Sequence, residues 1–281
     1  MSQSFADLLS DLWPVAAVSL VSAVLLQVGT FFYALRVGRF SVVDVTWGLS
    51  FGLIAVVGWL VSAGGTGGEA AGETGDAWRR GLVVVLTLLW GGRLAWHIGG
   101  RQRGETKDDP RYTELMSRAS GNPKLAALRQ VFLLQAVVAW FIALPLQFAM
   151  VDAGQPGVLL WLGVLLWGVG FFFEAVGDRQ LAVFKADPSN RGKVMDRGLW
   201  RYTRHPNYFG DACVWWGLFL VAADAGWSWL TLLSPLLMTW FLAAKTGKPL
   251  MEKQLSKSRP GYAEYVERTS GFIPLPPRGG R

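Results

Sequence analysis

Five long runs of apolar residues constrain the fold of this 281-residue chain more than any other feature. A helix needs about 20 apolar residues to cross the hydrocarbon core of a bilayer, which is roughly 30 Å thick. The runs that reach about this length are Leu12–Leu35, Val42–Ala63, Gly81–Ile98, Val131–Val151 and Val158–Val176. We therefore expect an all-α integral membrane protein.

A sixth apolar stretch, Ala212–Ala244, is too long for one helix. Asp224 interrupts it near its middle, which predicts a tight hairpin of two helices near Tyr208–Ala223 and Trp227–Ala244. This interpretation gives a bundle of seven transmembrane helices. Because the first helix of the hairpin would be short, a bundle of six helices is the alternative.

The composition excludes other classes of protein. Only 17% of the residues are charged and 52% are hydrophobic, whereas a soluble domain carries roughly 25% charged residues. A disordered chain and an ordinary cytosolic globule are therefore excluded. The single cysteine, Cys213, is expected to be buried and structural. In so apolar a chain, the net charge of +7 does not indicate a nucleic-acid partner, and we expect membrane lipids as partners instead.

The basic residues predict how the bundle is oriented. Of the 27 Lys and Arg residues, 25 lie on alternate connections, which share one side of the membrane in a seven-helix bundle. The positive-inside rule places that side in the cytoplasm. We therefore expect an N-terminus outside, a C-terminus in the cytoplasm and long cytoplasmic loops. We expect one membrane domain over residues 1–281, with a substrate side in 1–130 and nucleotide-binding loops in 131–281.

Ionisable residues inside the apolar runs are candidate functional residues, because a charge at membrane depth costs several kcal/mol unless it has a partner or faces a cavity. Asp44 lies near the start of the second run, and Arg93 and His97 lie one helical turn apart in the third. A structural ion pair between Asp44 and Arg93 is one interpretation. The other, compatible with the first, is that both residues line a substrate cavity.

The densest polar stretch is Glu174–Asp211, in which seven Lys and Arg residues alternate with Asp, Asn and Tyr. Converging cations suit phosphate groups, and side chains such as that of Asn190 suit ribose hydroxyls and a carboxamide. The stretch fits a nucleotide at the membrane face, although a lipid headgroup fits the composition equally well. It contains no GxGxxG or Walker motif, so a Rossmann or P-loop site is excluded.

The tail after Lys245 is a second polar segment. Tyr262 and Tyr265 are three residues apart and would share one face of a helix. The tail has little apolar content for insertion into the membrane interface, so we expect it to fold back over the polar stretch.

Several segments carry a resemblance to a known superfamily. Gly192–Tyr202 (GKVMDRGLWRY), Arg204–Gly210 (RHPNYFG) and Gly261–Pro274 (GYAEYVERTSGFIP) resemble the steroid 5-alpha-reductase C-terminal-domain superfamily. Asp44–Gly48 (DVTWG) and Phe173–Lys185 (FEAVGDRQLAVFK) resemble, more closely, its bacterial branch, the DUF1295 proteins. The HPxYxG element alone is also similar to isoprenylcysteine carboxyl methyltransferases and sterol reductases.

The resemblance implies a seven-helix protein of the bacterial inner membrane whose C-terminal half clasps NADPH. In the reductases, this cofactor gives a hydride to a carbon–carbon double bond of a lipid. We expect a cofactor site without a metal ion. It includes Asn190 and the residues that match cofactor-binding positions of the superfamily. They are Asp178, Lys185, Lys193, Tyr202, Arg204, His205, Asn207, Tyr208, Asp211, Tyr265 and Arg268.

The catalytic side matches less well. Steroid-type reductases use a Gln-Glu pair in the second span and a Tyr after the third, but the corresponding stretches here read Thr46-Trp47 and His97-Ile98. The nearest carboxyl is Asp44 and the nearest downstream phenol is Tyr112, so Asp44, Tyr112 and His97 are the catalytic candidates. We therefore expect an NADPH-dependent reductase of a lipophilic substrate that is steroid-like, isoprenoid or fatty acyl.

Two other functions stay open at this point. A membrane methyltransferase that uses S-adenosylmethionine would place a smaller nucleotide around the same motifs. The cations of the polar stretch favour NADPH over this cofactor, which has no phosphate. A lipid-binding membrane protein without catalysis is the second alternative, and the absence of the Gln-Glu pair supports it.

Overall fold

The computed structural model describes residues 3–64, 74–118, 121–152, 156–245 and 247–278. Among these residues there is no strand, and only Thr203 and Ser270 form an isolated bridge. The expected all-α fold is confirmed for these residues. Six helices within the described ranges are long and apolar enough to cross a membrane, which indicates a multi-pass membrane protein. They are Phe5–Val37, Phe40–Gly64, Ala77–Gln102, Pro123–Ile142, Val158–Ala186 and Trp227–Lys245.

The chain divides into two compact units. Met1–Leu160 and Val221–Ser234 form the first, called here the N-terminal unit. Trp161–Leu220 and Pro235–Arg281 form the second, called the C-terminal unit.

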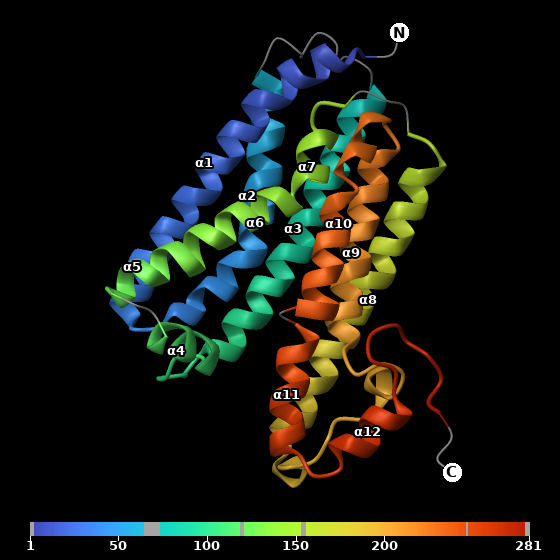
Figure 1. Cartoon of the computed structure of the whole chain (residues 1–281). Coiled ribbons are helices and arrows are strands. Elements are labelled where there is room, and N and C mark those ends of the chain that lie inside the picture. Colours follow the sequence, from blue (N-terminus) through green and yellow to red (C-terminus); the bar gives the residue numbers. More distant parts are fainter. Residues whose placement is uncertain (1–2, 65–73, 119–120, 153–155, 246, 279–281) are drawn as a thin grey trace. The chain divides into compact units, whose positions relative to one another are not determined.

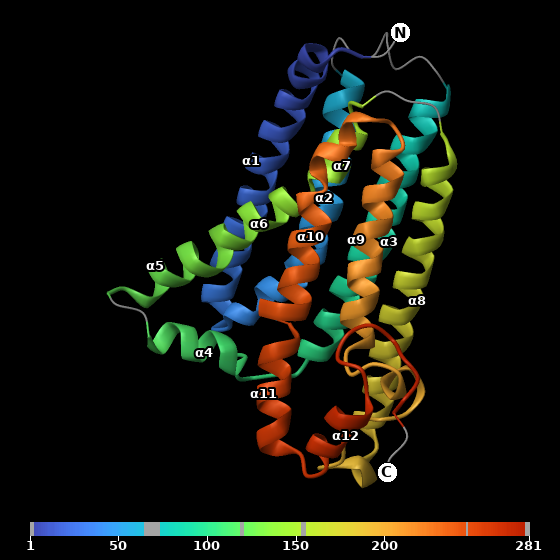
Figure 2. The same cartoon turned by 45° about the vertical axis from the view of Figure 1, so that its right-hand side comes forward.

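Three long helices dominate the N-terminal unit: α1 (Phe5–Val37), α2 (Val43–Gly64) and α3 (Thr74–Gln102). They lie side by side and alternate in direction (Figure 1). The π-helical segment η4 joins α5 to α6, and the resulting rod packs obliquely on α1 (Figure 2). The shorter elements are η1 (Phe40–Val42), α4 (Pro110–Ser117), α5 (Pro123–Ala127), η4 (Leu128–Leu133), α6 (Leu134–Ile142), α7 (Leu144–Ala149) and η7 (Trp227–Thr231).

Close contacts between helices fix the position of α2. A Cβ atom on Gly48 would lie 2.6 Å from the carbonyl oxygen of Gly91 on α3. Glycine at both positions lets the two backbones approach, as is common in membrane helices. On another side of α2, the buried amide of Gln27 on α1 donates a 3.1 Å hydrogen bond to Oγ of Ser50. These contacts hold the helix that carries Asp44.

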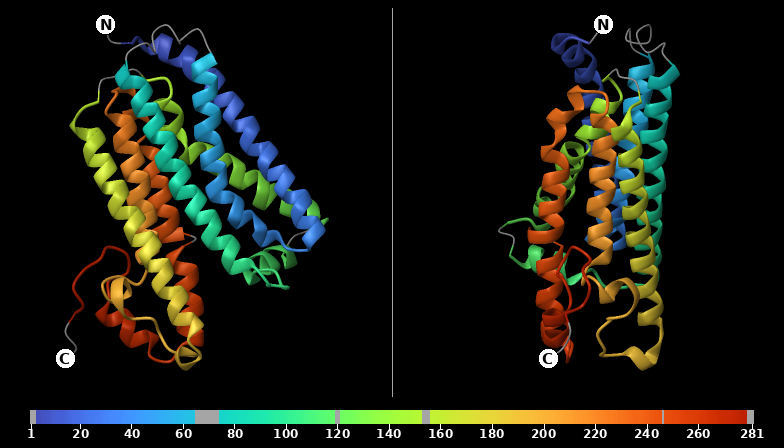
Figure 3. Two further views of the ribbon diagram at one scale, coloured as in Figure 1. Left: turned by 180° about the vertical axis from the view of Figure 1, so that it is seen from behind. Right: turned by 90° about the vertical axis from the view of Figure 1, so that its right-hand side faces the viewer.

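The C-terminal unit contains most of α8 (Val158–Ala186), α9 (Pro206–Ala223) and α10 (Leu233–Trp240). These helices lie side by side in every view (Figures 1 and 3). Trp216 on α9 donates a 3.0 Å hydrogen bond to Oγ1 of Thr239 on α10, and Cys213 is buried as expected. The remaining elements are η5 (Pro188–Asn190), η6 (Gly198–Arg201), η8 (Phe241–Lys245), α11 (Lys248–Ser258) and α12 (Tyr262–Arg268).

The structure confirms the break expected at Asp224. Helix α9 ends at Ala223, Gly226 adopts a φ of 118°, and η7 begins at Trp227. The Asp224 carboxylate accepts a hydrogen bond from the backbone N–H of Gly157. Helix α9 has 18 residues with polar ones near its start, and it is not among the six membrane-length apolar helices. A seventh span therefore stays a prediction.

Candidate functional sites

The first candidate site joins the start of α2 to α4 in the N-terminal unit. The hydroxyl of Tyr112 donates a 2.5 Å hydrogen bond to Oδ1 of Asp44. Nη2 of Arg111 lies 2.8 Å from Oδ2 of the same carboxylate and forms an ion pair with it. We call Asp44, Arg111 and Tyr112 the Asp44 cluster.

Two consecutive aspartates place α4 against α2. Asp109 is the N-cap of α4, and its side chain accepts a 2.9 Å hydrogen bond from the backbone N–H of Arg111. Asp108 accepts hydrogen bonds of 2.8 and 2.9 Å from the backbone N–H groups of Phe40 and Ser41, just before α2. The loop that follows α3 is thereby tied to the start of α2, which brings the first turn of α4 to Asp44.

Apolar packing surrounds the phenol of this cluster. Tyr112 is buried with Phe31, Val43 and Phe132, which come from α1, α2 and η4. Burial, followed by the negative charge of Asp44, raises the pKa of Tyr112 well above its ordinary value of 10.0. The phenol therefore stays protonated at neutral pH and can donate a hydrogen bond.

One of the two interpretations of Asp44, a structural ion pair with Arg93, is wrong. The cation at the Asp44 carboxylate is Arg111, because the loop after α3 returns to the first turn of α2 and delivers that residue there. Both oxygens of Asp44 accept hydrogen bonds, so Asp44 acts here as an acceptor. His97 is half-buried in α3 and is not among the groups bonded to Asp44.

The second candidate site lies in the C-terminal unit, where Arg204 holds the tail. Its Nε lies 2.8 Å from Oε1 of Glu252 on α11, and its Nη1 donates to the carbonyl oxygens of Val266 and Thr269 at 3.1 and 2.5 Å. Nε2 of His205 lies 3.1 Å from the same Oε1 of Glu252. We call Arg204, His205 and Glu252 the Arg204 clamp.

Burial and charge set the protonation states in the clamp. Burial lowers the pKa of His205 below 6.5, although the hydrogen bond to Glu252 opposes this shift. Burial acts to raise the pKa of Glu252, but hydrogen bonds from His205 and Arg204 outweigh it and lower that pKa to about 2. At neutral pH the clamp therefore pairs an ionised carboxylate with a guanidinium and a neutral imidazole.

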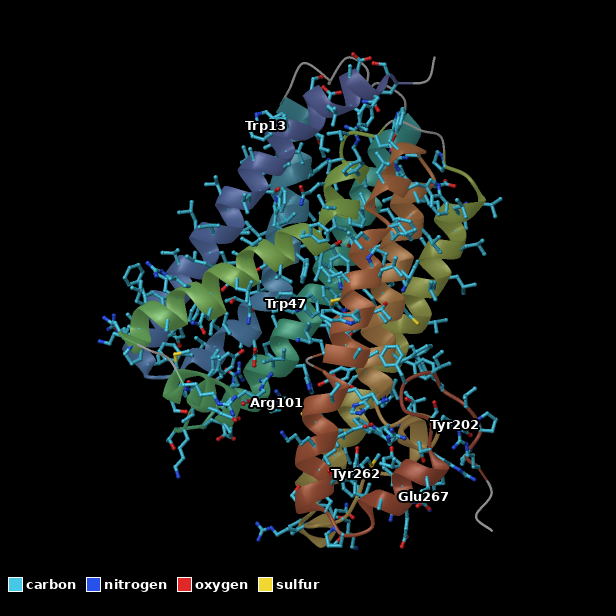
Figure 4. All side chains as sticks on the ribbon, viewed as in Figure 1. Trp13, Trp47, Arg101, Tyr202, Tyr262 and Glu267 are labelled. Atoms are coloured by element: carbon cyan, nitrogen blue, oxygen red, sulfur yellow. The ribbon has the colours of Figure 1, made fainter. Side chains whose placement is uncertain are left out.

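Further hydrogen bonds confirm that the tail folds back over the polar stretch. The buried hydroxyl of Tyr265 donates a 2.5 Å hydrogen bond to the carbonyl oxygen of Trp200. Oγ1 of Thr203 donates to the carbonyl oxygen of Phe272 at 2.8 Å. Tyr262 and Tyr265 share one buried face of α12, as their spacing predicted. Figure 4 shows Tyr202, Tyr262 and Glu267 gathered at this end of the C-terminal unit.

Several residues expected at the cofactor site have structural partners. Arg204, His205 and Tyr265 are buried and hold the tail, and Arg268 pairs with Asp196. Asn190 donates a 3.1 Å hydrogen bond to the carbonyl oxygen of Phe184 and so closes the turn after α8. These side chains shape the site and tie its parts together.

Other expected residues lie around the start of α9 or on the surface. Nδ2 of Asn207 donates a 3.2 Å hydrogen bond to Oδ1 of Asp178 on α8. The ring of Tyr208 stacks on that of His205 at a centroid distance of 5.3 Å. The remaining residues are buried Asp211 and exposed Lys185, Lys193 and Tyr202.

Two partners were not expected to carry the sites. Arg111 directly precedes Tyr112 in the sequence. A cation next to a candidate phenol was the one sequence feature that could have indicated a role for Arg111 at this site. Glu252 lies in the polar tail, and nothing in its local sequence indicates that it binds Arg204 and His205.

A comparison with protein families decides the classification. The model of DUF1295, a family of proteins of unknown function, matches residues 30–269. This chain belongs to the DUF1295 family. The match includes both the Asp44 cluster and the Arg204 clamp, so both are features of the family segment and not of an appended region.

One curated relative resembles this DUF1295 chain at low identity. The uncharacterized protein C594.04c of Schizosaccharomyces pombe is 24% identical over an alignment that covers 69% of this chain and 62% of the relative. The chain thus spans about three fifths of the length of that relative. No solved structure matches the chain with statistical significance.

Proposed function

We propose that this DUF1295 protein is a membrane reductase of the steroid 5-alpha-reductase superfamily, which uses NADPH to reduce a carbon–carbon double bond in a lipophilic substrate. The observation that carries the proposal is the convergence of three distant motif segments in the C-terminal unit. The Arg204 clamp joins the RHPNYFG segment to α11 and the tail, while Asn207 joins it to Asp178 on α8. Apart from α11, these are segments whose sequences carry the resemblance to the reductase superfamily or to its DUF1295 branch.

The side chains at this place fit a dinucleotide phosphate. Arg191, Lys193 and Arg197 are exposed cations on one loop, and cations of this kind bind phosphate oxygens. The Asn207–Asp178 pair offers amide and carboxylate groups that suit ribose hydroxyls or a carboxamide. When bound, the cofactor would supply a hydride. The tail held by Arg204 would keep this loop in place and exclude water from it.

The Asp44 cluster would serve the substrate side. Reduction of a conjugated double bond places negative charge on a substrate oxygen, and a positioned donor stabilises that charge. Tyr112 is a protonated phenol in apolar surroundings and is the donor that the geometry favours. Asp44 would act as a positioning residue that holds the hydroxyl until substrate arrives. The single O–H of Tyr112 would then turn from Asp44 to the substrate oxygen, and Arg111 would balance the charge left on Asp44. The apolar residues around Tyr112 favour a lipophilic substrate.

The topology forms part of the same proposal. We infer seven spans, with α9 as the additional one, an N-terminus outside and a C-terminus in the cytoplasm of a bacterial inner membrane. The basic connections support this orientation through the positive-inside rule. The Arg204 clamp and the loop that carries Arg191, Lys193 and Arg197 would then face the cytoplasm, where nucleotides are available.

Nucleotide binding to the purified full-length protein tests the proposal. NADPH should raise the unfolding temperature more than NADH or S-adenosylmethionine does, and Lys193→Ala should weaken NADPH binding roughly tenfold by removing a charge-assisted contact. Lys124→Ala, an exposed lysine of the N-terminal unit, is the matched control and should bind NADPH as the wild type does. Conjugated enones of steroid, isoprenoid and fatty acyl type should then be tested for NADPH consumption.

Other results would replace this function with one of its rivals. Stabilisation by S-adenosylmethionine in preference to NADPH would indicate a methyltransferase. Indifference to all three nucleotides would indicate a lipid-binding protein without catalysis.

A further inference from the structure

A groove opens on the surface of the N-terminal unit. It has a volume of about 700 Å³ and lies between α1 and the C-terminal end of α3, with the first turn of α2 as its floor. This volume is in the range of small-molecule sites, which is roughly 300–1,000 Å³.

The lining of the groove changes from apolar to polar along α1. Leu25, Leu26 and Gly29 line one end, and Arg39, with Arg103 from the loop after α3, lines the other. Helices α1 and α3 end at Val37 and Gln102, so the polar end lies where these apolar helices stop. In a bilayer this gradient runs from the hydrocarbon toward the headgroups. An amphiphile lying along a helix meets the same order of environments.

Two guanidinium groups stand at the polar end in defined positions. Nη1 of Arg39 donates a 3.2 Å hydrogen bond to the carbonyl oxygen of Gln102. The guanidinium of Arg103 lies over the ring of Trp96, 5.3 Å from its centroid. A guanidinium has five N–H donors, so the bond to Gln102 leaves donors on Arg39 for a phosphate. Basic pockets between membrane helices are suited to anionic headgroups.

The groove is distinct from the Asp44 cluster. Val45 and Thr46 form part of its floor. Successive residues of a helix are 100° apart, so Asp44 lies about 150° around α2 from the midpoint of these two residues. A molecule in the groove would therefore not contact the Asp44 carboxylate, and the proposed reductase function does not depend on it.

We propose that this groove binds one anionic phospholipid of the bilayer. Its phosphate lies against Arg39 and Arg103, and one acyl chain follows Leu25, Leu26 and Gly29 along α1. A zwitterionic phospholipid carries a cation next to its phosphate and gains less from the two guanidinium groups, so the groove discriminates by headgroup charge.

Two changes separate the headgroup contact from the acyl-chain contact. Arg39→Gln combined with Arg103→Gln removes both cations. Gly29→Leu fills the apolar end, because a Cβ atom on Gly29 meets no atom within 4 Å and the new side chain has room to fold into the groove. Gly92→Leu is the matched control, since Gly92 is an exposed glycine of α3 outside the groove, with equally open space around its Cβ position.

Native mass spectrometry of the purified full-length protein measures the bound lipid after titration with phosphatidylglycerol or phosphatidylcholine in a neutral detergent. The wild type and Gly92→Leu should each retain one phosphatidylglycerol in preference to phosphatidylcholine. The double Gln variant should bind phosphatidylglycerol about 30-fold more weakly. This factor follows because each lost cation removes roughly 1 kcal/mol of binding free energy. Gly29→Leu should lose binding of both lipids.

The proposal is overturned if the wild type retains the two lipids equally, or if either groove variant retains phosphatidylglycerol as the wild type does. Thermal unfolding of each variant without lipid shows whether it is folded. If Gly29→Leu does not fold, the double Gln variant decides the question by itself.

Discussion

The phenol of Tyr112 and the carboxylate of Asp44 lie 2.5 Å apart, although 68 positions separate them in the chain. Asp44 belongs to a helix of membrane length, and Tyr112 belongs to a short helix after the next one. Their bond therefore couples the position of α4 to the transmembrane part of the N-terminal unit. It also places a protonated donor at the edge of an apolar cluster.

Tyr112→Phe should separate this bond from the packing around it. The change keeps the ring and leaves Oδ1 of Asp44 without its donor, which should lower the free energy of unfolding by about 1–3 kcal/mol. Under the proposed function it should also abolish most turnover and leave NADPH affinity unchanged. Thermal unfolding, nucleotide titration and NADPH consumption measure the three effects. Tyr33→Phe, which changes an exposed tyrosine of α1, should alter none of them, and full turnover by Tyr112→Phe would exclude the phenol as donor.

A double-mutant cycle should identify the partner of Asp44. Asp44→Asn combined with Arg111→Gln should show a coupling energy of about 0.5–3 kcal/mol in thermal or denaturant unfolding, because the two side chains are in contact. The cycle of Asp44→Asn with Arg93→Gln should give a smaller coupling energy. A larger coupling with Arg93 would contradict the pairing seen in the structure.

Acidification should release the tail in two steps. Because the pKa of His205 is lowered in the folded protein, the unfolded chain binds a proton more readily, and docking of the tail weakens as the pH falls below about 6.5. Glu252 has its pKa lowered from 4.5 to about 2, so its contribution is complete above pH 4.5 and is lost as the pH falls toward 2. Hydrogen exchange of α12 as a function of pH measures both steps.

Substitutions assign the two steps to their residues. His205→Gln should flatten the upper step, which begins below about pH 6.5. Glu252→Gln should remove the lower step, which begins below pH 4.5. Glu267→Gln changes an exposed carboxylate of α12 and should leave the profile as in the wild type. If Glu252→Gln keeps the lower step, another carboxylate controls the tail.

Gly48→Ala should strongly destabilise the N-terminal unit. The added Cβ would lie 2.6 Å from the backbone oxygen of Gly91, so the two helices would have to separate. Overpacking of this kind costs about 1–3 kcal/mol, which thermal unfolding in detergent measures. Gly81→Ala on α3 adds a Cβ in open space and should be neutral or slightly stabilising. Equal stability of the two variants would show that α2 and α3 are not closely packed.

Cysteine labelling tests the proposed orientation in a Cys213→Ala background. Ser10→Cys, before the first apolar run, should react with an impermeant reagent from outside. Ser189→Cys, in η5, should react only after the membrane is permeabilised. Reaction of Ser189→Cys in sealed cells would rule out the proposed topology.

The sequence by itself determined the features that depend on local residue order. Runs of about 20 apolar residues predicted the long helices, because the bilayer thickness and the rise of a helix set that length. Asp224 predicted the break in the last apolar stretch, since an acidic residue with a glycine two positions later disfavours the continuation of an apolar helix there. The three-residue spacing of Tyr262 and Tyr265 predicted their shared face, because helical periodicity is local.

Only the tertiary structure decided which distant residues meet. A carboxyl group in an apolar run requires a partner, but Arg93 and Arg111 satisfy that requirement equally well in the sequence. Arg111 forms the ion pair with Asp44 because Asp108 ties the loop after α3 to the start of α2. In the same way, Arg204 was expected to line the cofactor site, yet the returning tail brings Glu252 and backbone carbonyl oxygens to it. Ion pairs and hydrogen bonds act over a few ångströms, so the path of the chain in space selects among chemically equivalent partners.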